Sequence, residues 1–140
     1  MSHEENMKRL NELLAEEIEA GVRYLHLSMT VKGLDRLLIK GVLLENMKET
    51  FEHAQMIADR ILQLGGAPRL ELKLSLPPEK TTAKEAIRTA IAFEQAALDA
   101  YRELLEKVEC EGNTVLEEFA REQVAVESQH VADLQLLLED

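Results

Sequence analysis

Strong helix-ending signals fall at three places in this chain and leave four long stretches between them. The signals are Gly33, the Gly65-Gly66-Ala67-Pro68 run and Gly112-Asn113. Within each stretch, apolar residues recur every three or four positions, as they do along amphipathic helices. A lone Gly41 in the second stretch weakens a helix locally without interrupting its apolar pattern. We therefore predict an all-α chain of four helices.

Local capping signals place the ends of these helices. Three stretches open with a capping box, in which a Ser or Thr is followed three residues later by a Glu. The boxes are Ser2-x-x-Glu5, Thr82-x-x-Glu85 and Thr114-x-x-Glu117, and Asp35 opens the remaining stretch. The predicted helices run from Ser2 to the stop at Gly33, from Asp35 to Leu64, from Thr82 to Gly112 and from Thr114 to Leu138.

Residues 65–81 form the one extended connection. Its alternating leucines are Leu70, Leu72, Leu74 and Leu76, and Pro77 and Pro78 follow them. A short strand is one interpretation. A crossover that runs the length of a bundle, with its leucines packed on the helices, fits better because no second strand is available for pairing. The other connections are short turns, so each consecutive helix pair is antiparallel.

Composition and charge exclude several classes of function. The 140 residues contain no internal linker, so we predict a single domain over 1–140. The formal charge of -11 argues against nucleic acid as a partner, because a duplex would repel it.

No stretch approaches the roughly 18 apolar residues of a membrane span, and the acidic N-terminus does not resemble a signal peptide. The single Cys110 cannot form an internal disulfide, which fits a reducing compartment, so we predict a cytoplasmic protein.

The middle of each apolar stripe carries side chains that can bind a metal. They are Glu17 in the first helix, His53 in the second, Glu94 in the third, and Glu127 with His130 in the fourth. The Glu-x-x-His spacing places Glu127 and His130 on one face of their helix. Three carboxylates meeting in an apolar core would raise one another's pKa, and such a cluster makes little sense without cations.

Carboxylate oxygens together with two imidazoles suit iron or manganese, with zinc as a competitor. The competing hypothesis is an iron-free scaffold whose buried acids pair with basic side chains. It needs cations at the same level of the bundle, and none of Arg23, Arg60, Arg88 and Arg102 lies there. The pattern therefore favours a metal site.

At these positions the sequence resembles bacterioferritin, of the ferritin-like di-iron family, over nearly its whole length. The first helix matches through Leu10-Asn11-Glu12-Leu13-Leu14-Ala15-Glu16-Glu17 and Tyr24-Leu25, and the second through His53-Ala54 and Arg60-Ile61-Leu62-x-Leu64-x-Gly66-x-Pro68. Phe93-Glu94 and Glu127-x-x-His130-x-x-x-Leu134 match the third and fourth. The resemblance implies a ferritin-like four-helix bundle with one long B–C crossover. The chain stops at Asp140, so we expect no fifth helix.

The resemblance also implies a chemistry. Glu17 and His53 would hold one iron of a di-iron site, Glu94 and His130 the other, and Glu127 would bridge them. The implied activity is that of a ferroxidase: Fe(II) is oxidised by dioxygen or peroxide, and the product is stored in a hollow homo-oligomeric shell. An electron-donor protein that releases the iron would be a further partner. Tyr24 lies where the family keeps a tyrosine beside the metals, although a core tyrosine with a satisfied hydroxyl is an equal alternative.

The second helix departs from the family pattern at the metal site. The family has Glu three residues before the metal-binding histidine of its second helix, and this chain has Thr50, whose hydroxyl is a neutral and weak ligand. Glu49 is the nearest substitute, because it lies four residues before His53 on the same side of the helix. A solvated or pore-facing acid is an equal interpretation of Glu49. The alternative function is therefore a non-catalytic ferritin-like metal-binding protein, in which Thr50 has abolished turnover.

A second departure concerns haem and assembly. The family binds haem through a methionine two places before the metal-binding histidine of its second helix, where this chain has Phe51. Met47 is one turn earlier, but an apolar subunit contact suits it better, so we predict no haem. Without a fifth helix, a twelve-subunit shell or a dimer is favoured over the largest cages of the family. A peroxide-scavenging relative of the rubrerythrin type is disfavoured, because the cysteine pairs of its extra iron site are absent.

Overall fold

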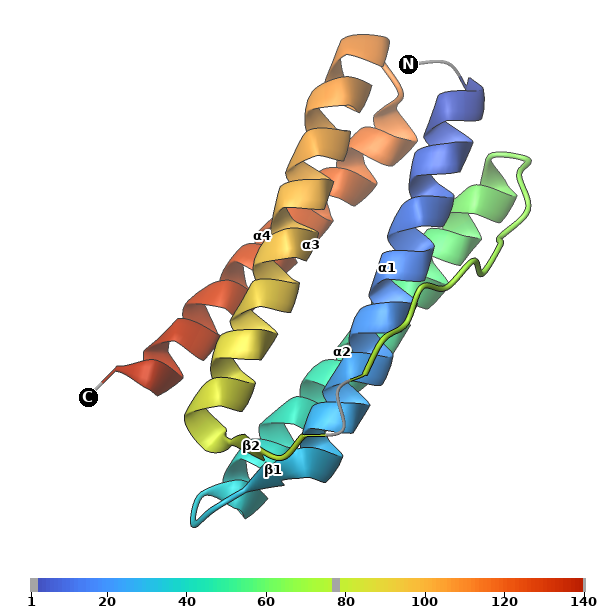
Figure 1. Cartoon of the computed structure of the whole chain (residues 1–140). Helices are drawn as coiled ribbons and strands as arrows, with labels where there is room; N and C mark the ends of the chain where they lie inside the picture. Colours follow the sequence, from blue (N-terminus) through green and yellow to red (C-terminus); the bar gives the residue numbers. More distant parts are fainter. Residues whose placement is uncertain (1–2, 77–78, 140) are drawn as a thin grey trace.

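The computed structural model of the chain describes residues 3–76 and 79–139, and four long helices make up most of them. Figure 1 shows these helices as two pairs. The helices are α1 (His3–Thr30), α2 (Arg36–Gln63), α3 (Ala83–Glu111) and α4 (Thr114–Leu138), and the strands are β1 (Val31–Lys32) and β2 (Thr81–Thr82). The predicted all-α four-helix bundle is confirmed. No helix in the described ranges is long and apolar enough to span a bilayer.

The helices associate mainly as consecutive pairs, α1 with α2 and α3 with α4. The connection between α2 and α3 returns along the outside of α1 for nearly the length of the bundle (Figure 1). We call this connection, residues 64–80, the crossover. The crossover makes α3 run parallel to α2 and antiparallel to α1 (Figure 1), which is the connectivity of ferritin-like bundles.

The helix ends agree with the predicted caps at both ends of α3. The Thr82 hydroxyl accepts a hydrogen bond from the Glu85 backbone N–H, and Gly112 ends α3 in the left-handed conformation at φ +70. Asp35 precedes α2 but makes no side-chain cap bond. Ser2, predicted to open the first helix, lies outside the described residues.

The cap predicted at Thr114 is wrong. Thr114 is the first helical residue, and the Asn113 side chain before it accepts the hydrogen bond from the Leu116 backbone N–H at 3.3 Å. Asn and Thr are both good capping residues and stand next to each other here, so the pattern of residues alone does not choose between them.

Two expectations about the crossover are also wrong. A second strand is available after all: β1, directly after α1, pairs in parallel with β2, with Val31 opposite Thr81 and Lys32 opposite Thr82. The four alternating leucines are not buried by the bundle, although Leu76 lines a cavity together with Arg23 and Leu27 of α1. They are exposed in the single chain, namely Leu70, Leu72, Leu74 and Leu76 at 60, 43, 39 and 37% of their surface.

Backbone groups of the crossover fasten it to α1. The Asn11 side chain accepts from the Arg69 N–H at 2.7 Å and donates to the Ala67 carbonyl at 3.3 Å. The Glu19 carboxylate accepts from the Lys73 N–H at 2.6 Å. These bonds turn one edge of the crossover towards α1.

The interior contains two apolar clusters with a polar layer between them. One cluster includes Leu14, Ala54, Tyr101 and Ala120, and the other includes Tyr24, Leu43, Ala90 and Leu134. Apart from Asn6 and Ser28 near the two ends of α1, the buried polar residues of each helix fall between its contributions to the two clusters. They are Glu17, Thr50, His53, Glu94, Gln123 and Glu127, each no more than 8% exposed. This layer is where the predicted site lies.

Candidate metal centre

All five predicted ligand residues converge in the polar layer, and all four helices contribute. Glu17 comes from α1, His53 from α2, Glu94 from α3, and Glu127 and His130 from α4. Four of the five are buried, and His130 is half-buried. We call these five side chains the centre. Each lies on the apolar stripe of its helix, and packing of the stripes brings them together.

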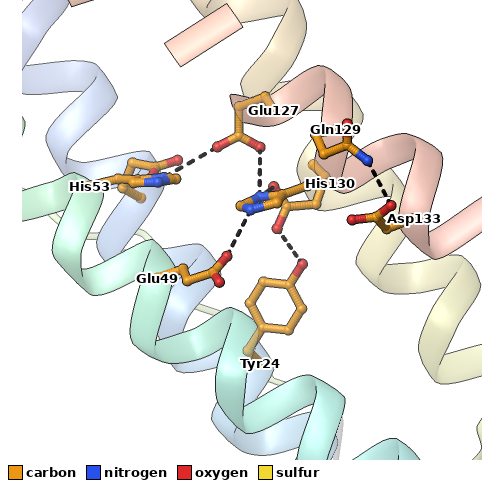
Figure 2. A network of polar contacts seen from close by, with 9 residues as sticks. Tyr24, Glu49, His53, Glu127, Gln129, His130 and Asp133 are labelled. Atoms are coloured by element: carbon orange, nitrogen blue, oxygen red, sulfur yellow. Dashed lines mark hydrogen bonds and ion pairs between the residues drawn. The ribbon is translucent and has the colours of Figure 1, made fainter. Parts of the chain in front are cut away.

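Glu127 lies between the two histidines and contacts both of them (Figure 2). Its Oε1 lies 3.3 Å from Nδ1 of His53, and its Oε2 lies 3.7 Å from Nδ1 of His130. The same Nδ1 atoms face a second carboxylate each: His53 lies 3.3 Å from Glu17 Oε2, and His130 lies 3.5 Å from Glu94 Oε2. The two imidazole rings are nearly parallel, with their centroids 6.0 Å apart.

The centre thus contains two overlapping sets of ligand atoms. Glu17, His53 and Glu127 form one set, and Glu94, Glu127 and His130 form the other. Within each set, one ligand atom per residue lies within 4.8 Å of the others. The atoms that face one another include buried ones without a hydrogen-bond partner: Oε2 of Glu17 and Glu127, and Nδ1 of both histidines. Orphaned buried polar atoms cost stability, so their convergence fits a pair of cations.

Electrostatics in the centre favour positive charge between the carboxylates. Burial would lower the pKa of His53, but Glu127 and Glu17 raise it to about 10. Contacts with Glu127 and Glu94 likewise raise the pKa of His130 to about 10. Burial would raise the pKa of Glu127, but His130 and His53 lower it to about 2. Without metal, protonated imidazoles take the role that metal cations can fill.

Tyr24 is bonded directly to the centre. Its hydroxyl donates a hydrogen bond of 2.6 Å to Oε1 of Glu94, which leaves Oε2 to face His130 (Figure 2). Burial and the charge of Glu94 raise the pKa of the tyrosine, so the hydroxyl stays protonated and keeps donating. Tyr24 is therefore both satisfied and adjacent to the candidate ligands.

The two residues considered for the missing carboxylate lie in different places. Thr50 is buried at 6% exposure, in the polar layer between the two apolar clusters. Glu49 is more exposed, and its Oε2 lies 2.7 Å from Nε2 of His130, on the far side of the ring from Glu127 (Figure 2). Glu49 thus contacts the ring nitrogen of His130 that faces away from Glu127, at the more exposed edge of the centre.

Phe51, at the position of the family's haem methionine, packs against α1. Its ring lies so close to Gly21 that a Cβ added there would collide with it. Met47, the other residue considered for haem, packs against one of the apolar clusters. Both side chains therefore have packing roles inside this subunit.

Two further buried polar side chains were missed as functional candidates, Gln123 in the layer and Tyr101 in one of the apolar clusters beside it. Tyr101 and Gln123 are 0 and 1% exposed, and the Tyr101 hydroxyl and the Gln123 Oε1 lack hydrogen-bond partners. Both lie on the inward stripes of α3 and α4. Their inward positions, within about two helical turns of Glu94 and Glu127, were the signal that could have drawn attention to them.

A four-helix bundle with one long crossover, in which every helix contributes a carboxylate or an imidazole to a buried centre, defines the class of ferritin-like di-iron carboxylate bundles. A family model described as Ferritin-like domain matches residues 7–140. The chain therefore belongs to the ferritin-like family, as the resemblance predicted. No curated protein matches the sequence significantly.

Solved structures support the same assignment. A ferritin-like, diiron-carboxylate protein from Bacillus anthracis str. Ames is 27% identical, with a TM-score of 0.85 over 99% of this chain and 100% of that one. A dodecameric thioferritin, the bacterioferritin-related protein from Bacteroides fragilis, is 26% identical, with a TM-score of 0.86 over 96% of this chain and 84% of that one. A Dps protein from Bacillus brevis is 17% identical and shares the fold, with a TM-score of 0.89 over 98% and 97%.

Proposed function

We propose that this protein binds Fe(II) at the centre within each subunit and oxidises it with dioxygen or peroxide, and that it stores or detoxifies the product inside a homo-oligomeric shell. The relatives supply the context: one is described as a diiron-carboxylate protein and another as a dodecameric thioferritin. The observation that carries the proposal is the arrangement of unpaired buried oxygen and nitrogen atoms around Glu127.

The residues present fit a pair of metal ions. Glu127 offers one oxygen to each set of ligand atoms, and each set adds one carboxylate and one imidazole. Oxygen and imidazole donors suit iron. In the described ranges, no Lys or Arg forms an ion pair with these carboxylates, so a basic side chain does not take the place of the metal there.

The proposed reaction balances without a further reductant. Two Fe(II) ions give up one electron each. One hydrogen peroxide takes up both electrons and two protons and becomes two waters. Alternatively, one dioxygen takes up both electrons and two protons and becomes hydrogen peroxide. The histidines that face the carboxylates bind protons before Fe(II) arrives and release them when it binds.

Thr50 favours one alternative, a metal carrier without fast turnover. A buried threonine at this position leaves the centre with three carboxylates, and Glu49 contacts His130 from behind. Under this alternative the protein binds Fe(II) tightly but oxidises it slowly. Thr50→Glu would then speed oxidation by more than about tenfold.

Fe(II) oxidation kinetics test both functions. Protein loaded with Fe(II) without oxygen is mixed with dioxygen or peroxide, and Fe(III) absorbance and oxidant consumption are followed. We expect fast oxidation that saturates at two Fe(II) per chain, and a loss of more than about tenfold in rate in Glu127→Gln. Glu122→Gln, an exposed acid on the same helix, is the matched control. Tight binding with slow oxidation would select the carrier, and no Fe(II) binding would refute both functions.

A further inference from the structure

A cavity outside the centre lies between α1, α3 and the end of the crossover. It has a volume of about 570 Å³ and is open to solvent. Leu27, Leu76 and Phe93 form its apolar wall, and arginines line it from two helices, Arg23 from α1 and Arg88 from α3. We call it the basic cavity. None of the five side chains of the centre lines it, so a ligand bound there is separate from the metals.

The charge of the basic cavity is opposite to that of the chain as a whole. Its described lining has three basic side chains, Arg23, Lys80 and Arg88, against the two carboxylates of Glu79 and Glu85. In the whole chain, Asp and Glu outnumber Lys and Arg by 27 to 16. The cavity that α1 shares with residues 66–73 follows the overall charge, because five Glu and three basic side chains line it. A local excess of positive charge in an acidic protein attracts anions to this one place.

Strong ion pairs do not neutralise the two arginines of the basic cavity. Glu19 holds Arg23 only loosely, because its Oε1 lies 4.0 Å from Nη1 of the arginine and its Oε2 accepts the Lys73 N–H at 2.6 Å. Arg88 is exposed and forms no ion pair with any residue in the described ranges. A guanidinium group can bind a carboxylate, sulfonate or phosphate through two parallel N–H bonds. Both arginines are therefore available to an oxyanion.

Packing holds the apolar wall of the basic cavity in place. The ring of Phe93 packs edge-on with the ring of Tyr24, with the centroids 5.4 Å apart and the planes at 90°. Leu27 and Phe93 both pack against the apolar cluster that contains Tyr24. Ligand sites of roughly 300–1,000 Å³ typically combine such a preformed apolar wall with a few polar groups that fix the orientation of the ligand. The basic cavity has the size and both kinds of wall.

We propose that the basic cavity binds an organic anion, a molecule with one oxyanion group and an apolar body. The oxyanion contacts Arg23 and Arg88, and the apolar body lies against Leu27 and Phe93. A free inorganic oxyanion would leave the apolar wall in contact with water, and a neutral apolar molecule would make no use of the arginines. Because the two walls adjoin, they favour a ligand that has both parts. This site is additional to the proposed function and does not depend on metal.

Two fluorescent probes with the same ring system test the role of charge. Anilinonaphthalene sulfonate carries an oxyanion, and phenylnaphthylamine lacks it. We expect the metal-free, assembled protein to bind the sulfonate saturably, at one per chain, and more tightly than the neutral probe. Arg23→Gln with Arg88→Gln should weaken sulfonate binding by about tenfold and neutral binding by less than about twofold. Arg36→Gln with Arg102→Gln is the control, because it removes the same charge outside both cavities.

A variant that changes volume tests the position of the site. Thr89 is half-buried on α3 and lines the basic cavity. Thr89→Trp should fill part of the space and weaken the binding of both probes by more than about fivefold. Ala92→Trp places the same side chain at an exposed position of α3 outside the cavity and should leave both affinities unchanged within about twofold. Circular dichroism and analytical ultracentrifugation check the fold and the assembly of each variant.

Three outcomes would overturn the proposal. Equal losses of sulfonate binding in the two arginine pairs would mean that the probe responds to net charge alone. Equal effects of Thr89→Trp and Ala92→Trp would place the probe elsewhere on the surface. No saturable binding to the unmodified assembled protein, as when a neighbouring subunit fills the cavity, would also refute it. These measurements use no metal, so the proposed function is decided separately.

Discussion

At the scale of single residues, Glu127 organises the centre. One carboxylate contacts both imidazoles, and the pKa of Glu127 falls to about 2 because those contacts outweigh its burial. Glu94 is affected in the other direction, since burial raises its pKa to about 7. The centre therefore keeps one firmly ionised acid in the middle and a more easily protonated one beside His130.

Metal binding should depend on pH through the two histidines. Their pKa values are raised to about 10 in the metal-free protein, and an imidazole must lose its proton to bind a metal through Nδ1. The apparent affinity should therefore rise as pH increases towards 10, by up to about tenfold per pH unit for each proton released. Calorimetric titration with Zn(II) in buffers of different ionisation enthalpy measures that number of protons. Affinity that stays constant between pH 6 and 9 would contradict the prediction.

The sequence was sufficient to predict which residues form the centre but not all of their contacts. Helical periodicity assigns Glu17, Glu94 and Glu127 to inward faces, because a stripe needs only the spacing of residues. The contact of Glu49 with the far nitrogen of His130 depends on side-chain rotamers and on the rotation of two helices about their axes. The spacing of residues specifies neither the rotamers nor the helix rotations, so the sequence alone did not decide whether Glu49 points to the centre.

At the scale of elements, the same limit explains the error at α4. Helix ranges follow from apolar stripes and breakers to within a few residues, but the choice between adjacent capping residues depends on backbone angles. Asn113 has a non-helical φ of -82 and ψ of 85, and its side chain reaches the Leu116 N–H.

Capping variants should distinguish the two residues at this turn. Asn113→Ala should lower the free energy of unfolding by about 1 kcal/mol, because one N–H at the start of α4 loses its acceptor. Thr82→Ala should cost a similar amount at α3. Thr114→Ala is the matched control and should change stability by less than about 0.5 kcal/mol. Urea denaturation followed by circular dichroism measures all three, and a larger loss in Thr114→Ala than in Asn113→Ala would restore the original assignment.

At the scale of the whole molecule, the crossover presents an apolar edge to its surroundings. Arg69, Glu71 and Lys73 line a cavity of about 850 Å³ shared with α1. In an extended segment, successive side chains point to opposite sides. Leu70, Leu72 and Leu74 therefore point away from α1, which accounts for their exposure, whereas Leu76 lines a second cavity together with Leu27 of α1. The sequence could not reveal this, because a leucine buried against a neighbouring subunit and one buried in its own bundle give the same pattern.

We expect this edge to contact another copy of the chain in the assembled protein. Leu72→Lys together with Leu74→Lys should shift the molecule towards smaller species, because each lysine would place a charge in an apolar contact. Glu71→Lys adds the same side chain to the opposite edge and serves as the control. Analytical ultracentrifugation gives the mass, and an unchanged assembly in the leucine variant would exclude this edge from the interface.

The hydrogen bonds that tie the crossover to Asn11 and Glu19 all use its main-chain groups, within the ranges that the structure describes. Side chains in that segment can consequently be exchanged without undoing its attachment. Related proteins can thus acquire different neighbours by changing a few outward residues there, while the bundle and its buried acids stay as they are.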